Sequence, residues 1–100
     1  MTTILKGNWK VQAINHPTGE PRLDERYSRR INSIVRIVVA EESRPFTWLY
    51  QTDGNGEPKS GLFCTDTTTS IKATRSAFYR RKDTLTVETV NSVYVLKKIA

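Results

Sequence analysis

Apolar side chains recur at every second position in several segments of this chain, and this spacing restricts its fold more than any other feature. Because successive side chains of a β-strand point to opposite faces of a sheet, a period of two predicts strands with one buried face. The residues that share one face are Trp9, Val11 and Ala13 in NWKVQAI, and Phe46, Trp48 and Tyr50 in FTWLYQ.

The segment INSIVRIVVA, residues 31–40, is apolar on both faces. Val35, Ile37 and Val39 fall on one face of the predicted strand, and Ile34 and Val38 fall on the other. A strand of this kind is usually central or covered on both faces. Because a small sheet does not cover both, we expect an exposed apolar patch, and from it a homodimer.

Two β-rich runs near the C-terminus, TLTVETV and VYVLKKI, are separated by Asn91 and Ser92 and predict a hairpin. Turn-forming residues separate the other strands, at 15–21, 41–45 and 53–61.

One segment, residues 23–32, has helical spacing, since Leu23, Tyr27 and Ile31 recur every four positions. We therefore predict an all-β or nearly all-β fold, formed by a single domain over residues 1–100. Its architecture is a small antiparallel barrel or sandwich of about 5–7 strands, with at most one short helix near residues 23–32.

The segment LKGNWKV resembles the Gly-x-Trp opening of lipocalin-like barrels, and VYVLKKI looks like their closing strand. This resemblance covers about a dozen residues and implies antiparallel β structure. We infer no ligand and no binding site from it.

The charge balance is basic, with 16 Lys and Arg against 10 Asp and Glu, a net charge of +6. Such an excess favours nucleic acid, an anionic surface or an acidic protein as a partner. The single cysteine allows no internal disulfide, the first residues do not resemble a signal peptide, and no apolar run is long enough to span a bilayer. We expect a cytoplasmic protein without a membrane partner.

Residues with catalytic or metal-binding chemistry are few. His16 is the only histidine and lies in an apparent turn, and Cys64 is the only cysteine, so a zinc site is not expected. DGNGEP, from Asp53, begins like a calcium loop, but Pro58 and Cys64 occupy positions that require Gly and Glu. We expect Cys64 to be a small buried residue rather than a nucleophile. The sequence thus predicts no enzyme, no cofactor and no metal.

Positive charge is concentrated between Thr67 and Lys82, where no acidic residue occurs. Aromatic side chains beside such cations can stack nucleic-acid bases while the cations hold phosphates. Whether Phe78 or Tyr79 instead faces the core is left open by the sequence. The predicted polyanion-binding residues are Lys72, Arg75, Tyr79, Arg80, Arg81 and Lys82.

A second basic group is interrupted by Asp24 and Glu25 and consists of Arg22, Arg26, Arg29, Arg30 and Arg36. The charge distribution favours a non-catalytic β module that binds nucleic acid or another polyanion. The alternative is an adaptor or inhibitor of the phage or mobile-element type, which docks on an acidic protein surface.

Overall fold

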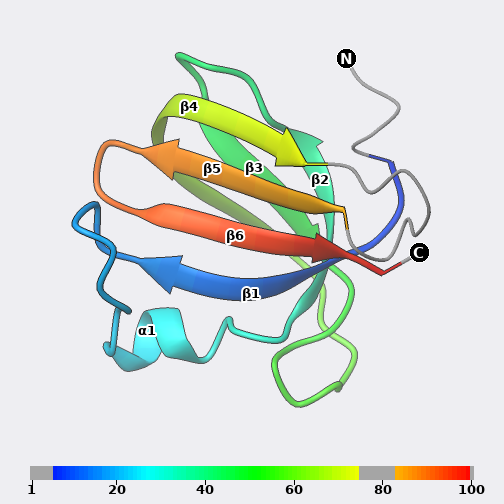
Figure 1. The fold of residues 1–100 in the computed structure, drawn as a ribbon. Coiled ribbons are helices and arrows are strands. Elements are labelled where there is room, and N and C mark those ends of the chain that lie inside the picture. Colours follow the sequence, from blue (N-terminus) through cyan, green and yellow to red (C-terminus); the bar gives the residue numbers. More distant parts are fainter. Residues whose placement is uncertain (1–5, 75–82, 100) are drawn as a thin grey trace.

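A computed structural model describes residues 6–74 and 83–99, and in it six strands form one closed barrel (Figure 1). The strand order around the barrel follows the sequence, and β1 and β6 close it by pairing with each other. All neighbouring strands are antiparallel, which confirms the predicted fold class and agrees with the resemblance to antiparallel barrels. The elements are β1 Trp9–Asn15, α1 Glu25–Ser28, β2 Ile34–Val39, β3 Pro45–Tyr50, β4 Leu62–Thr74, β5 Thr84–Thr89 and β6 Val93–Lys98.

Strand β4 is the longest, with 13 residues, and it serves two neighbours. Its first part pairs with β3, from Leu62 to Thr67, and its second part pairs with β5, from Thr68 to Thr74. β5 and β6 form the predicted C-terminal hairpin, whose turn is closed by the Thr89 N–H donating to the Ser92 carbonyl at 2.8 Å.

The core fills the barrel interior and consists largely of aromatic and branched side chains. Phe46, Trp48 and Tyr50 are all buried, as their shared face predicts, although Thr47 between them is buried too. Trp48 is at the centre of the aromatic packing, with ring centroids 5.7 Å from Phe46 and 5.9 Å from Tyr94. The other buried apolar residues are Trp9, Val11, Ile14, Val35, Leu85, Val87 and Leu96.

Bulges in β1 and β2 change the predicted faces. The register of β1 against β6 shifts between Val11 and Ala13, so beyond the shift Ile14 is fully buried and Ala13 is only half-buried. Placing Ala13 on the buried face was therefore wrong, because one extra residue in a strand reverses the alternation that follows it.

A similar shift in β2 lies between Ile37 and Val39, and Val38 is 55% exposed. The outer face of β2 is thus open to solvent at Val38, as expected for a small sheet that does not cover both faces of this strand.

The helix α1 is shorter than the predicted range, with 4 residues. Tyr27 and Ile31 pack against the core as their spacing predicted, whereas Leu23 is 86% exposed. Figure 1 shows α1 beside β1, at the side of the barrel where the β5–β6 turn lies. The connection between β1 and β2 therefore covers this end of the barrel. None of the helical residues described forms a span long and apolar enough to cross a membrane.

Candidate functional site

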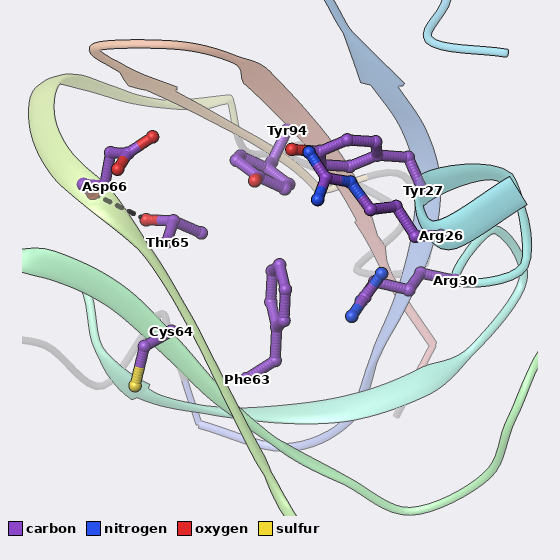
Figure 2. Close-up of a pocket in the computed structure, with 8 residues that line it drawn as sticks. All are labelled: Arg26, Tyr27, Arg30, Phe63, Cys64, Thr65, Asp66 and Tyr94. Carbon is purple, nitrogen blue, oxygen red and sulfur yellow. Dashed lines mark hydrogen bonds between the residues drawn. The ribbon is translucent and has the colours of Figure 1, made fainter. Parts of the chain in front are cut away.

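A cavity of about 280 Å³ lies between the α1 segment and the first part of β4. Figure 2 shows Arg26 of α1 and Arg30, which follows α1, on one side of this cavity and Thr65 and Asp66 on the other, with the rings of Phe63 and Tyr94 between them. The residues that line it are Arg26, Tyr27, Arg30, Phe63, Cys64, Thr65, Asp66 and Tyr94.

The α1 wall is held by a short run of helical hydrogen bonds. The backbone N–H groups of Tyr27 and Ser28 donate to the carbonyl of Asp24, and the N–H of Arg29 donates to that of Glu25. Residues four positions apart on a helical turn lie on the same side. The turn therefore brings Arg26 and Arg30 to the same cavity.

Aromatic rings position the guanidinium groups of this wall. The guanidinium carbon of Arg30 lies 4.4 Å from the ring centroid of Phe63. Arg22 and Arg26 lie over the ring of Tyr27, at 4.7 and 5.1 Å. An arginine over an aromatic face is attracted to the negative ring face and keeps its edge free for hydrogen bonds.

The charges of Arg26 and Arg30 are not neutralised by an acidic side chain of residues 6–74 or 83–99. Within those ranges the ion pair found is Arg44 with Glu41, at 3.1 Å on the exposed surface. The Nε of Arg30 is buried and has no hydrogen-bond partner in the described chain. Because a buried charged donor without a partner is costly, the wall is complementary to an anion.

The β4 wall contributes one aromatic ring and a hydroxyl group that is already engaged. The centroid of the Phe63 ring lies 4.6 Å from that of Trp48, so the core holds the ring in place. The Thr65 hydroxyl accepts the N–H of Phe46 at 3.0 Å and donates to the Asp66 carbonyl at 2.7 Å. Thr65 thus stabilises β4 against β3.

The β5–β6 turn connects the two walls. On the α1 side, Arg22 donates through Nε to the Ser92 hydroxyl at 2.8 Å, and through a second nitrogen to the Asn91 carbonyl. On the β4 side, the Asn91 amide donates to the carboxylate of Asp66. These bonds fix the exposed Asp66 carboxylate at the cavity edge.

Tyr94 closes the inner end of the cavity and is 3% exposed. Burial raises the pKa of its hydroxyl above the ordinary value of 10.0, and a hydrogen bond with Ser92 opposes this in part. Its side chain is therefore neutral at physiological pH and contributes an aromatic wall without charge.

Cys64 is exposed, so the prediction of a buried cysteine is wrong. On β4 Phe63 and Thr65 are partly buried, and strand alternation places Cys64 on the outer side between them. Its sulfur lies 3.6 Å from the hydroxyl of Thr47. Over the described ranges, no three His, Cys, Asp or Glu side chains are grouped as metal ligands would be.

The residues predicted from the acid-free stretch are not those that line the cavity. Lys72 is exposed near the end of β4 and pairs with Thr86 of β5. The others lie outside the described residues, and with them Phe78, whose direction was left open; they are Arg75, Tyr79, Arg80, Arg81 and Lys82.

Two members of the second basic group, Arg26 and Arg30, line the cavity instead, and Arg22 supports it. Their four-residue spacing was the available signal in the sequence. The contributions of Phe63, Asp66 and Tyr94 had no such signal, because they depend on the register of β4 and on the closure of the barrel by β6.

Comparison of this chain with protein families, with curated proteins and with solved structures finds no match.

Proposed function

We propose that this protein is a non-catalytic β-barrel module that binds nucleic acid or another polyanion. The observation that carries the proposal is the α1 wall, where Arg26 and Arg30 are held on aromatic rings without an acidic partner among the described residues. The net charge of +6 attracts polyanions to the whole molecule.

Phosphate contacts and ring stacking are the two interactions that such a surface provides. Arginine binds phosphate with paired hydrogen bonds, and aromatic side chains stack on bases of any sequence. The exposed Lys72 and the basic residues predicted from the sequence, Arg75 and 80–82, would extend phosphate contacts beyond the cavity.

The test is binding of random single-stranded and double-stranded oligonucleotides over a series of salt concentrations. If about four phosphates are neutralised, the logarithm of affinity falls with the logarithm of salt concentration at a slope of about −3. If the parent protein does not bind oligonucleotides at low salt, the proposal is contradicted.

Two variants test the two groups of basic residues separately. The first replaces Arg26 and Arg30 by Glu, and the second replaces Arg80, Arg81 and Lys82 by Glu. Each should greatly weaken oligonucleotide binding. The first should also lower the melting temperature, because it removes the contact of Arg30 with the Phe63 ring, and circular dichroism checks that the variant is folded. Lys10→Glu together with Lys97→Glu, on the exposed sides of β1 and β6, is the control for the first variant, because both double variants change the net charge equally. If this control weakens binding as much as the first variant does, net charge alone is responsible.

The alternative is docking on an acidic protein surface, and Leu23 and Leu62, which are 86% and 62% exposed, favour it. Failure of oligonucleotide binding together with salt-sensitive binding to an acidic protein would replace the first function by this one.

A further inference from the structure

Donors and acceptors are divided between the two sides of the cavity. The α1 side presents guanidinium groups, which only donate hydrogen bonds, and the β4 side presents the carboxylate of Asp66, which only accepts them. A ligand that satisfies both sides has an anionic group at one end and N–H or O–H donors at the other.

The anionic end is selected by the arginines. The guanidinium carbon of Arg30 lies 4.4 Å from the Phe63 ring centroid, and the buried Nε has no partner in the described chain. Two guanidinium groups at one cavity, Arg26 in α1 and Arg30 in the turn that follows it, match the several acceptor oxygens of a phosphate better than those of a single carboxylate.

The middle of the ligand meets aromatic side chains. Figure 2 shows Phe63 and Tyr94 rising between the arginine side and the Asp66 side. The two ring centroids are 6.1 Å apart and the rings are inclined at 62°. Because Arg30 and Trp48 lie against the Phe63 ring and Tyr94 is 3% exposed, a planar ligand ring would contact the edges of these two aromatic rings. A planar ring is therefore the group that fills this part of the cavity best.

The volume limits the size of the ligand. Ligand cavities commonly measure about 300–1,000 Å³, and this one, at about 280 Å³, is at the small end. It has room for one phosphorylated ring compound and no room for a longer stretch of nucleic acid.

We propose that the cavity holds a single nucleotide monophosphate unit, with its phosphate on Arg26 and Arg30, its base against Phe63 and its polar edge at Asp66. The inference takes its ligand class from the proposed function and names the unit that the cavity recognises. The unit is either a free nucleotide or the phosphorylated end of a strand.

The probes are adenosine 5′-monophosphate, ribose 5-phosphate, inorganic phosphate, and a tetranucleotide with and without a 5′-phosphate. Calorimetric titration of the full chain should show one site for adenosine 5′-monophosphate. Ribose 5-phosphate and inorganic phosphate, which have no base, should bind at least about tenfold more weakly, because they lack the contact between the base and the aromatic side chains. Equal affinity for inorganic phosphate and the nucleotide overturns the inference.

The two tetranucleotides distinguish the sources of the unit. A preference for the 5′-phosphorylated one assigns the cavity to strand ends. Binding of the mononucleotide with equal affinity for both tetranucleotides assigns the cavity to free nucleotides. Absence of nucleotide binding in every form overturns the inference.

Arg30→Gln should weaken adenosine 5′-monophosphate binding by about tenfold or more, since it removes charge-assisted hydrogen bonds. Arg29→Gln is the matched control, because Arg29 is an exposed neighbour outside the cavity lining and the variant loses the same charge. Far-ultraviolet circular dichroism and the melting temperature show that each variant is folded. Equal losses in the two variants overturn the cavity as the site.

Failure of this inference and failure of the proposed function give different results. If the parent binds oligonucleotides and Arg30→Gln binds them equally well without any mononucleotide site, only the cavity assignment fails. If the parent binds mononucleotides through Arg30 but not oligonucleotides, the cavity assignment holds and the polyanion function fails.

Discussion

The guanidinium carbon of Arg30 lies 4.4 Å from the centroid of the Phe63 ring, and that ring in turn lies 4.6 Å from the ring of Trp48. A cation at the cavity is thereby connected to the centre of the barrel by two successive ring contacts. Phe63 is half-buried and has two roles, since one side belongs to the core and the other to the cavity.

The coupling between Arg30 and Phe63 can be measured with a double-mutant cycle. Phe63→Ala should lower the free energy of unfolding by about 2–3 kcal/mol, less than a fully buried Phe, because the side chain is only half-buried. The pairwise term with Arg30→Gln should be about 0.5–1 kcal/mol. Urea denaturation of the four proteins measures it, and strictly additive losses would show that the contact contributes nothing.

Gly54 permits a close approach between the loop of residues 51–61 and the backbone of residues 29–31, which we call the arginine segment. A Cβ at this position would lie 2.5 Å from the Ile31 carbonyl oxygen and 3.0 Å from that of Arg29. Gly54→Ala should therefore cost about 1–3 kcal/mol of stability and displace the backbone beside Arg30, which weakens anion binding.

Gly56→Ala is the control for this substitution. No atom lies within 4 Å of its Cβ position, but its φ of +85° is strained for Ala. The expected cost is about 1–2 kcal/mol, with anion binding unchanged. If both variants bind anions as the parent does, the loop does not position the arginine segment.

Tyr94 should make stability depend on pH at the alkaline end. Burial raises its pKa in the folded state above the ordinary 10.0, so the folded protein retains the proton that the unfolded chain loses. The stabilising contribution of the protonated Tyr94 hydroxyl to the free energy of unfolding is fully present below pH 10, and it is lost as the pH rises through the folded-state pKa. In denaturation experiments between pH 8 and pH 11, the free energy of unfolding should fall less steeply with pH for Tyr94→Phe than for the parent. If the free energy of unfolding falls equally with pH in both proteins, Tyr94 does not cause the pH dependence.

The expected homodimer remains a prediction, and the outer face of β2, β3 and β4 gives it a location. Val38, Leu49 and Leu62 are 55%, 37% and 62% exposed on these three neighbouring strands. Val38→Glu should convert a dimer into a monomer in sedimentation velocity at micromolar concentration. If the parent sediments as a monomer at high concentration, the prediction of a homodimer is wrong.

Much of the barrel was predictable because the period of two is a local property of each strand. Phe46, Trp48 and Tyr50 needed no knowledge of their neighbours to be placed inside. The bulges at Ala13 and Val38 were not predictable in this way, since a register shift is decided by the pairing of two strands.

The cavity was only half predictable. Arg26 and Arg30 belong to the second basic group noted in the sequence, and their four-residue spacing could have indicated a common face on the predicted helix. Their meeting with Phe63 depends on the closure of the barrel, which brings segments distant in the sequence together. The net positive charge favoured the partner class that we propose, whereas the candidate cavity could be located only with the structure.

The β5–β6 turn has one further consequence. Arg22 on one wall and Asp66 on the other are both bonded to residues 91–92, so a single short turn sets the distance between the walls. Lengthening this turn by one or two residues would widen the mouth without changing any core side chain. For the binding site proposed here, the size of the ligand would be adjustable through this turn, independently of the side chains that form the core.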